Sequence, residues 1–590
     1  MTVEKLITDH IDIWSSALQT RSTAGRGSNG KIDLYGIKKL RELILELAVR
    51  GKLVPQDPND EPASELLKRI AAEKAELVKQ GKIKKQEPLP EISEDKKPFE
   101  LPEGWEWITL SEIATINPKI EVTDDEQEIS FVPMPCISTR FDGAHDQEIK
   151  KWGEVKKGYT HFADGDIALA KITPCFENSK AVIFKGLKGG VGVGTTELHV
   201  ARPINSELNL QYILLNIKSP HYLSMGESMM TGSAGQKRVP RSFFENYPIP
   251  FPPNTEQTRI VGTFSKLMFL CDQLEQQSLT SLEAHQQLVE TLLATLTDSQ
   301  NAEVLAENWA RISLHFDTLF TTEVSIDALK QTILQLAVMG KLVPQDPNDE
   351  PASELLKRIE QEKAQLVKEG KIKKQKPLPP VSDEEKSFEL PDGWEWTTMQ
   401  GLYPEFQNGL SSRGSSSGKD SVVIRLADIK NWKVSFADTR AIAITDSEKQ
   451  KYCLDKNDIL IVRVNGSADI VGGFVLYDDD QNVCYCDHFI RLRLPYKRVI
   501  DENYLILVAS SPLIRRKINN LFITTAGQKT VNQTHISSLL FPLPPYKEQK
   551  CIVARVNELF SLCEQLKLRL QSAHQTQLNL ADALTDAALN

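Results

Sequence analysis

The order of hydrophobic and polar positions predicts long helices at both ends of a repeated frame, with short strands between them. Leucine, isoleucine and alanine between positions 40 and 48 recur every three or four residues, which is typical of an amphipathic helix. Gly51 and Pro55 end this helix, and residues 63–80 predict a second one with glutamate and lysine on its polar face. Short apolar runs predict strands at 166–170, 181–184, 458–462 and 473–477.

A long helix is predicted after each Pro-x-Pro-Pro segment. Apolar residues from 260 to 296 and from 552 to 574 approximate a heptad pattern, so the two helices are predicted to pair as an antiparallel coiled coil within one chain. About 40 residues at 1.5 Å each give a rod of roughly 60 Å. The predicted seam, in which Val289 is an alternative to Leu288, consists of Phe264, Leu267, Leu274, Leu288, Leu292, Val556, Leu559 and Leu566.

An internal repeat organises the whole chain. Residues 51–70 (GKLVPQDPNDEPASELLKRI) return unchanged at 340–359, and the match closes on FELPEGWEW and FELPDGWEW, always 289 residues apart. Further along, AGQK, Pro-x-Pro-Pro and Glu-Gln-x-x-Ile-Val return 292 residues apart. Between these anchors, residues 108–165 and 397–457 share little. Drift alone after duplication does not leave twenty identical residues beside nearly unrelated ones, whereas gene conversion of the frame could. Functional divergence of the two inserts is the favoured explanation.

The repeat predicts an α+β protein with a pseudo-twofold internal repeat, in which two different globular domains are separated by the two long helices. We expect a helical region at 1–107, a first variable domain at 108–253 and a central region with a long helix at 254–396. A second variable domain at 397–545 and a final helix at 546–590 complete the chain. Two similar frames with two different inserts indicate one scaffold that presents two recognition surfaces.

Length and composition narrow the class of protein. A chain of 590 residues is expected to hold two to four domains, and it contains no run of eighteen apolar residues that would span a membrane. The first residues lack the basic start and apolar run of a secretory signal. The eight cysteines are scattered, and the Cys484-x-Cys486 pair has no CxxC partner, so we expect reduced cytoplasmic thiols and no zinc framework.

Three segments resemble catalytic motifs but lack their essential parts. Residues 25–31 fit GxxxxGK, yet Ile32 stands where a magnesium-binding Ser or Thr is needed. Residues 414–418 fit GxSxG but lead from a polar loop into a strand. Pro544-Pro545-Tyr546 resembles the catalytic Pro-Pro-Tyr motif of adenine methyltransferases, but Leu543 stands where that motif needs Asp or Asn. The segment is therefore predicted to close a domain. A self-contained enzyme is therefore disfavoured, while a scaffold that binds only proteins stays open.

The net charge of −10 argues against nucleic acid only when it is taken over the whole chain. Residues 254–396 carry −10, whereas residues 108–253 carry −2 and residues 397–545 carry +3. Within the first variable domain, residues 165–253 carry +3, and the acidic residues gather at 124–128. The charge distribution therefore permits two modestly basic reading faces on an acidic frame.

The chain resembles the specificity subunit of type I restriction–modification enzymes. In that family Leu-Pro-x-Gly-Trp opens each variable domain, as at Leu101–Trp105 and Leu390–Trp394 here. The family also closes each domain with Gly-Gln-Lys, then Pro-x-Pro-Pro-x-x-Glu-Gln-x-x-Ile-Val and a long helix, as this chain does twice. The long GKLVPQDPNDEPASELL frame is similar to the subgroup called type IB.

The resemblance implies a non-catalytic reader of double-stranded DNA in the bacterial cytoplasm. Each variable domain would be a target recognition domain for one half of a split, asymmetric sequence, and the paired helices would space the halves. The constant regions would dock two methyltransferase subunits, which bring S-adenosylmethionine, and motor–nuclease subunits would bring ATP and Mg²⁺. No cofactor, metal ion or membrane is expected on this chain.

Candidate DNA-contacting residues are the cations and amides in predicted loops of the variable domains, since base edges and phosphates are read by such groups. Those in the first domain are Arg140, Lys171, Asn178, Lys180, Gln236, Lys237, Arg238 and Arg241. Those in the second are Arg413, Lys419, Arg425, Arg463, Asn465, Gln528, Lys529 and Asn532. The Gln-Lys pair recurs in both domains and cannot distinguish two half-sites, so it is predicted to contact the DNA backbone or to shape a loop. Lys171 and Arg463 differ and are better candidates for discrimination.

Overall fold

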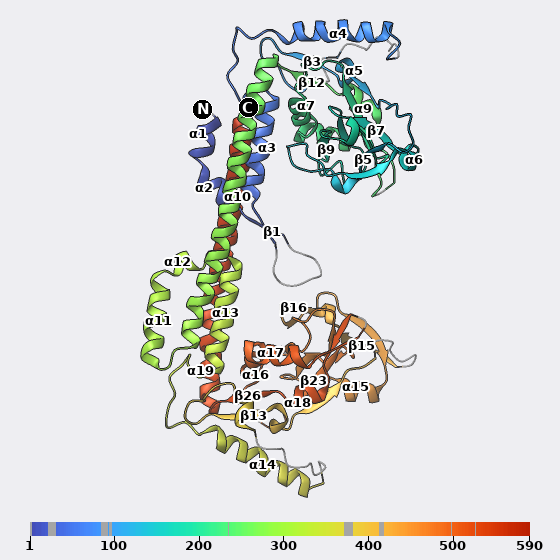
Figure 1. The fold of residues 1–590 in the computed structure, drawn as a ribbon. Helices are drawn as coiled ribbons and strands as arrows, with labels where there is room; N and C mark the ends of the chain where they lie inside the picture. Colours follow the sequence, from blue (N-terminus) through green and yellow to red (C-terminus); the bar gives the residue numbers. More distant parts are fainter. Residues whose placement is uncertain are drawn as a thin grey trace. The chain divides into compact units, whose positions relative to one another are not determined.

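The computed structural model describes residues 3–21, 31–83, 92–93, 97–233, 235–370, 381–411, 418–496, 498–525 and 527–589. It forms two compact units (Figure 1), each assembled from separate stretches of the chain. Unit 1 comprises Met1–Gln19, Asp33–Leu279 and His574–Asn590, and unit 2 comprises Thr20–Ile32 and Thr280–Ala573. The candidate Arg413 and most of the GxxxxGK and GxSxG segments lie outside the described residues.

The helical part of unit 1 begins with α1 (Val3–Thr8) and α2 (Ile11–Ser16). The chain next forms a ribbon of β1 (Gln19–Arg21) and β2 (Lys31–Asp33), most of which belongs to unit 2. It then continues in unit 1 with α3 (Tyr35–Val49) and α4 (Ala63–Lys79). The apolar face predicted between residues 40 and 48 is buried, and α3 ends before Gly51, which adopts a φ of +69°. The two helices predicted from the periodicity are therefore confirmed.

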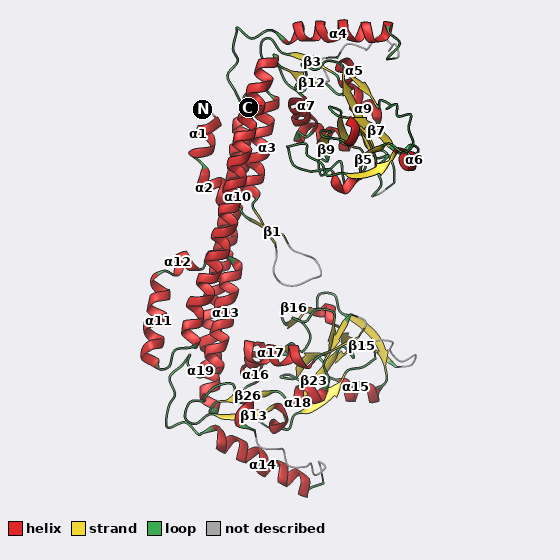
Figure 2. Cartoon of the chain, in the orientation of Figure 1, coloured by secondary structure: helices red, strands yellow, loops and turns green. Residues whose placement is uncertain are grey.

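The first variable domain holds two four-stranded sheets (Figure 2). One has the order β4 (Ala114–Ile116), β11 (Leu198–Pro203), β8 (Ile167–Ala170), β9 (Ala181–Ile183). The other has the order β6 (Glu148–Lys151), β5 (Glu128–Val132), β10 (Val191–Gly194), β7 (Thr160–Ala163), in which β5 and β10 are parallel. The helices of this domain are α5 (Leu110–Ile113), α6 (Trp152–Val155), α7 (Leu210–Ile217), α8 (Pro220–Ser228) and α9 (Arg241–Asn246).

The second variable domain, in unit 2, repeats this topology. Its larger sheet has the order β14 (Glu405–Asn408), β23 (Phe489–Arg493), β19 (Ile459–Val462), β21 (Phe474–Leu476). Its second sheet has the order β18 (Arg440–Ile444), β15 (Lys419–Ile424), β22 (Cys484–Tyr485), again with a parallel pair, β15 and β22. The short pair β16 (Ile429–Lys430) and β17 (Lys433–Val434) and helices α15 (Asp446–Tyr452), α16 (Glu502–Ser510), α17 (Pro512–Leu521) and α18 (Gln533–Ser537) complete it. All four strands predicted from apolar runs are confirmed.

The repeated motifs form the same clasp in both copies. Trp105 Nε1 donates to Glu256 Oε2 at 3.0 Å, and Gln56 Nε2 donates to the other carboxylate oxygen at 3.2 Å. In the second copy, Trp394 and Gln345 donate to Glu548 at 2.9 and 3.1 Å. Each domain also closes with a two-stranded pairing, of β3 (Glu106–Ile108) with β12 (Ile249–Phe251) and of β13 (Glu395–Thr398) with β26 (Leu540–Leu543). The Leu-Pro-x-Gly-Trp and Glu-Gln motifs therefore fasten each variable domain to its frame.

The long helices α10 (Asn254–Thr297) and α19 (Tyr546–Leu589) have 44 residues each and contribute to both units. In unit 1, α3 contacts both helices: Arg41 pairs with Asp272 at 2.6 Å, and Tyr35 Oη donates to Asp582 at 2.7 Å. In unit 2, α13 (Glu323–Val338) takes the position of α3, and Lys330 forms an ion pair with Glu564. A third helix therefore packs with the long helices in each unit.

This third helix changes the predicted seam. Phe264, Leu267 and Val556 are buried, and Leu274, Leu292, Leu559 and Leu566 are partly buried. Leu288 is wrong as a seam residue, because it is 50% exposed while Val289 is 2% exposed. Residues of α11 (Ala302–Leu314), α12 (Phe316–Leu319) and α13 share one hydrophobic cluster with Val289, so several helices determine the buried face there. The helix α14 (Ala352–Lys368) repeats α4. No helix among the described residues is long and apolar enough to cross a membrane.

Candidate nucleic-acid interface

The Gly-Gln-Lys part of the repeated AGQK motif lies at the tip of a β-hairpin in both variable domains. In the second domain β24 (Ile523–Thr525) pairs with β25 (Gln528–Thr530); we call residues 523–525 and 527–530 hairpin 2. Residues 231–233 and 235–238 form the equivalent hairpin 1, which Thr231 and Arg238 close by mutual backbone hydrogen bonds of 3.1 and 2.8 Å. The sequence predicted that this motif lies in a loop. The structure differs in part, because Gln528 and Lys529 belong to a strand and pair with Thr525 and Thr524.

A glycine gives both hairpin tips the same conformation. Gly235 and Gly527 each have a φ of +79°, a region that side chains with a Cβ rarely adopt. No atom outside the neighbouring residues lies within 4 Å of a Cβ placed at either glycine, so backbone conformation rather than crowding explains the residue type. Gln236, Lys237 and Gln528 are exposed beside these tips.

Each hairpin lies next to the end of the central strand of its domain. The carbonyl oxygen of Lys171, which follows β8, accepts from Val239 N at 2.8 Å, and that of Arg463, which follows β19, accepts from Val531 N at 3.0 Å. Beyond Arg463, β20 (Val464–Asn465) pairs with β25. The structure therefore brings Lys171 together with 236–238, and Arg463 and Asn465 together with 528–532.

Several candidate side chains near the hairpins are held by other protein groups. Arg238 donates to both carboxylate oxygens of Glu197, at 2.9 and 2.8 Å, and the guanidinium lowers the pKa of Glu197. Lys529 Nζ donates to the Gly466 carbonyl at 3.0 Å, and Asn532 caps α18 by accepting from His535 N at 2.8 Å. Arg463 has one longer contact, from Nη1 to the Asp487 carbonyl at 3.4 Å. Arg463 is therefore better placed than Arg238 to exchange its contact for one with a ligand.

Other candidates lie apart from the hairpins or serve the fold. Arg425 donates to Asp428 at 3.1 and 2.8 Å and to the Asp438 carbonyl at 2.6 Å. Lys180 Nζ donates to the Met134 carbonyl at 2.8 Å, and Arg241 pairs with Glu245. These contacts favour structural roles for the three cations. Two further candidates are exposed: Lys419, whose side chain is 85% exposed, and Asn178, which lies in a turn.

Arg140 belongs to a different surface, beside α10. Its guanidinium lies 4.0 Å from Asp272, and it lines a cavity of about 660 Å³ with Arg41, Phe141 and other residues of unit 1. Its carbonyl oxygen accepts from Lys218 Nζ at 2.6 Å. Lys218 is 2% exposed, and burial lowers its pKa to about 7. Sequence reasoning missed Lys218, since nothing in the pattern marks this lysine as buried.

We expect Lys218→Met to stabilise the fold near neutral pH. Between about pH 7 and 10.5 the unfolded chain binds a proton at Lys218 that the folded chain does not, so stability falls as the pH is lowered through this window. Removing the amine should raise the free energy of unfolding by about 1–3 kcal/mol at pH 7, a net value that allows for the lost hydrogen bond to the Arg140 carbonyl. The gain should be smaller at pH 10. Denaturant unfolding at both pH values measures this, with the exposed Lys237→Met as control. An equal gain at both pH values would contradict it.

A second feature that sequence reasoning missed is the pairing of Glu197 with Arg238. A comparison of the two copies at the 292-residue offset gives one signal for this pair, because Arg238 aligns with Thr530 and the position therefore differs between the copies.

All eight cysteines are free thiols, as predicted. Among the described residues one group could hold a metal ion, Cys486, Asp487 and His488, and it lies near Arg463.

Comparison with known proteins identifies the family. A sequence profile described as the type I restriction modification DNA specificity domain matches residues 102–284 and 420–572. The chain is 72% identical to the type I restriction enzyme EcoEI specificity subunit of Escherichia coli, over 100% of both chains. The chain belongs to the type I restriction–modification specificity subunits. It is also 65% identical to the EcoAI specificity subunit of Escherichia coli, over 100% of both chains.

A solved structure of a type I R-M system, described as the structural basis of complex assembly and conformational transition, contains a chain similar to this specificity subunit. The match covers 84% of this chain and 99% of that one, with 17% identity and a TM-score of 0.49. The first match contains the whole first variable domain of the specificity subunit, and the second contains the second domain from residue 420 onward, so each hairpin falls within one match.

Proposed function

We propose that this chain is the non-catalytic DNA-reading subunit of a type I restriction–modification complex, and that each variable domain reads one half of a split, asymmetric target. The observation that carries the proposal is that both domains have an equivalent four-stranded sheet, a parallel strand pair in the second sheet and the same hairpin, but different side chains at equivalent positions. Lys171 aligns with Arg463, Thr173 with Asn465 and Arg238 with Thr530. One scaffold with two sets of side chains supports recognition of two different sequences.

Within each domain we assign the hairpin tip to the DNA backbone and the residues beside it to the bases. The tip carries Gly-Gln-Lys in both copies, so it supplies the same contacts to both half-sites. The residues that follow β8 and β19 differ and are candidates for base readout. The variable domains carry −2 and +3 while residues 254–396 carry −10, so this chain alone should bind DNA weakly, with partner subunits supplying phosphate contacts.

The constant frame is proposed to dock two copies of one methyltransferase subunit. The clasps around Glu256 and Glu548 make the same contacts, and the exposed residues in the first half of α4 and α14 are also identical. One example is the Arg69–Glu61 pair, which recurs as Arg358–Glu350. Folding alone does not require exposed residues to be identical, whereas two copies of one partner do. S-adenosylmethionine, ATP and Mg²⁺ would be bound by the methyltransferase and motor–nuclease partners.

The long helices α10 and α19 are proposed to act as an antiparallel coiled-coil spacer between the two reading domains. Their equal length and their contributions to both units support this role. The separation of the half-sites would then depend on helix length. We expect the half-sites to lie about one DNA turn, or about 34 Å, apart.

Target-enrichment sequencing with the complex purified from its host tests the proposal. Enrichment of a bipartite sequence with two different halves is expected, and methylation at that sequence should require this chain. Enrichment of no sequence, with assembly intact, would identify a protein scaffold instead. Methyl transfer by this chain alone would identify it as an enzyme.

We expect Arg463→Ala to relax recognition of one half-site only. Loss of a base contact costs about 1–3 kcal/mol, which corresponds to about 5- to 150-fold in affinity for the cognate target. Binding of the assembled complex to a panel of half-site variants measures the effect. Lys529→Ala is the matched variant, since this lysine recurs as Lys237; it should weaken binding to all sequences alike and reduce the salt dependence. Equal loss on all sequences for Arg463→Ala would make this arginine a phosphate contact.

A further inference from the structure

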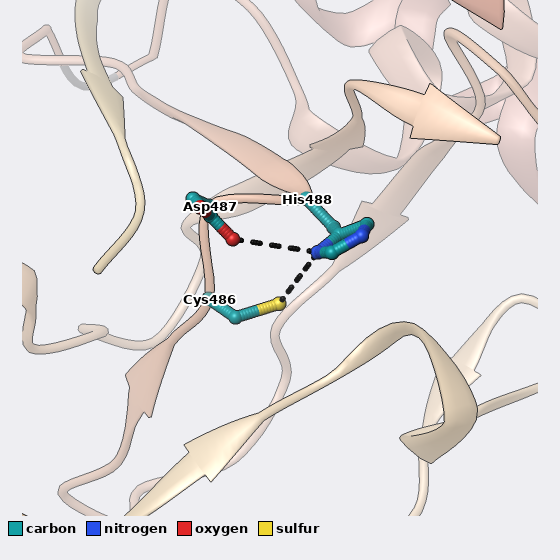
Figure 3. Close-up of side chains that lie close together, drawn as sticks. All are labelled: Cys486, Asp487 and His488. Carbon is teal, nitrogen blue, oxygen red and sulfur yellow. Dashed lines mark hydrogen bonds and ion pairs between the residues drawn. The ribbon is translucent and has the colours of Figure 1, made fainter. Parts of the chain in front are cut away.

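Three side chains with metal-binding atoms converge in the turn between β22 and β23 of the second variable domain. Figure 3 shows Cys486, Asp487 and His488 pointing toward one another. Cys486 Sγ lies 3.8 Å from His488 Nδ1, and the same nitrogen lies 3.4 Å from Asp487 Oδ1. All three atoms lie within 4.8 Å of one another. No other such group occurs in the part of the chain that the structure describes.

The backbone of this turn is fixed on several sides. Cys486 N donates to the Ile424 carbonyl at 3.0 Å, and Asp487 N donates to the Leu410 carbonyl at 2.8 Å. Phe489 N closes the turn on the Cys486 carbonyl at 3.1 Å. Neighbouring strands therefore hold the three side chains in place, as a preorganised metal site requires.

The spacing of the donor atoms fits zinc. Bonds of about 2.3 Å to sulfur and about 2.1 Å to nitrogen and oxygen give a tetrahedron with edges of about 3.6 Å between sulfur and nitrogen and about 3.4 Å between nitrogen and oxygen. The two measured contacts, 3.8 and 3.4 Å, are close to these edges. Rotation of the Asp487 side chain can shorten the remaining edge, between sulfur and oxygen.

The chemistry of the donors also favours a cation. The Oδ1 atom of Asp487 is shielded from solvent and accepts no hydrogen bond from any described residue, although the carboxylate as a whole is partly exposed, and a bound cation would supply the partner that this oxygen lacks. A bound Zn²⁺ would displace the thiol proton to solvent and take the thiolate as a ligand. The His488 and Asp487 side chains are 47% and 41% exposed, so an ion can reach them from solvent.

We propose that Cys486, Asp487 and His488 bind one Zn²⁺ ion, with water as the fourth ligand. The equivalent turn of the first domain provides an internal contrast. Lys171 N donates to the Glu197 carbonyl as Arg463 N donates to the His488 carbonyl, so the equivalent turn carries Thr195, Thr196 and Glu197. These residues offer neither a thiol nor an imidazole, and the one carboxylate, that of Glu197, is held by Arg238. The proposed zinc site therefore belongs to the second variable domain alone, so only this domain would need a metal ion for its function.

The ion would fix the base-reading residue of the second domain, a step that rests on the proposed function. Arg463 N donates to the His488 carbonyl at 2.7 Å, and Arg463 Nη1 contacts the Asp487 carbonyl. Metal ligation of the adjacent side chains would hold both carbonyl groups and therefore the arginine. Zinc removal should affect recognition of the second half-site and leave the first unchanged.

Titration of the metal-free full-length chain with Co²⁺, under reducing conditions and without DNA, tests the site directly. One Co²⁺ per chain is expected, with tetrahedral visible absorption and a thiolate-to-metal charge-transfer band that Zn²⁺ abolishes. Cys486→Ala should remove the charge-transfer band, and His488→Ala should weaken binding at least tenfold. Cys484→Ala, which alters a buried cysteine outside the group, should bind like the unaltered chain, and circular dichroism checks that each variant is folded.

Binding without a thiolate band, or an unchanged spectrum for folded Cys486→Ala, would overturn the proposal. So would failure of the unaltered chain to bind Co²⁺ or Zn²⁺. Because this assay contains no DNA, its failure is distinct from failure of the proposed DNA-reading function. Half-site binding after chelation, with and without added Zn²⁺, then tests the link to Arg463.

Discussion

Asp458→Ala is expected to unfold the second variable domain and abolish recognition of its half-site. Asp458 is 1% exposed, and its carboxylate accepts from Arg493 Nε at 2.7 Å and from Arg493 Nη2 at 2.6 Å. It also accepts from Asp455 N at 2.8 Å, which fixes the turn that leads into β19. Removing one partner of a buried ion pair typically costs about 3–5 kcal/mol. Arg493 is 29% exposed and keeps Asp455 as a partner, so we expect the lower end of this range, about 3 kcal/mol.

The functional consequence follows from the position of Asp458 in the chain. The central strand β19 runs from this aspartate to Arg463, so the pair anchors one end of the strand that carries the proposed base reader at the other. Thermal unfolding and half-site binding of the assembled complex measure both effects. Asp455→Ala is the matched control: its carboxylate also reaches Arg493, at 2.8 Å, but is 69% exposed and should contribute less than about 1 kcal/mol.

The first domain offers the mirror-image variant. Asp166 accepts from Arg202 Nε and Nη2, both at 2.8 Å, and from Ala163 N at 2.8 Å. Asp166→Ala should therefore abolish recognition of the other half-site and spare the second. Loss of both half-sites in either variant, with assembly retained, would show that the domains do not read independently. Stability of Asp458→Ala within 1 kcal/mol of the unaltered chain would contradict the structural argument.

The repeat explains why so much of the fold could be predicted from one sequence. Residues 51–70 and 340–359 are identical, and two occurrences of one motif define the domain edges without any further information. The strands β8, β9, β19 and β21 are short apolar runs buried at nearly every position, which periodicity detects well. The closing role of Pro544-Pro545-Tyr546 also followed from comparison of the copies.

Contacts between distant residues could not be predicted in this way. The parallel pairing of β5 with β10, and of β15 with β22, joins segments that no local pattern connects. Leu288 matched the heptad spacing as well as Val289 did, and only the helices packed around α10 determine which one is buried. The group of Cys486, Asp487 and His488 could not be predicted from the spacing of the cysteines, because it depends on the turn that brings these three side chains together.

The candidate interface was predicted in composition but not in detail. The sequence marked Arg238 and Arg425 as candidate DNA contacts, yet each is held by a carboxylate, Glu197 or Asp428, that the fold supplies. Arg463 and Lys171 were chosen because they differ between copies, and they follow equivalent strands at equivalent backbone positions. Differences between the copies therefore identify candidate specificity residues better than charge alone.

Removal of one heptad from each long helix is expected to change the preferred spacing of the two half-sites. Residues 276–282 of α10 and 571–577 of α19 surround the points at which these helices pass from one unit to the other. Deleting seven residues shortens a helix by about 10.5 Å and turns it by only about 20°, so the packed faces stay aligned. At about 3.4 Å per base pair, the preferred spacer should become about three base pairs shorter.

Target-enrichment sequencing with the assembled complex, using libraries of variable spacer length, measures this change. Affinity for the original target should fall about 1000-fold or more, toward the level of non-specific binding, because only one half-site can then be engaged. Affinity for the shortened target should be close to that of the unaltered complex, which excludes misfolding as the cause. The matched control replaces the same fourteen residues with helix-forming residues of equal number and should keep the original spacer. Retention of the original spacer by the shortened chain would exclude the helices as the element that sets the distance.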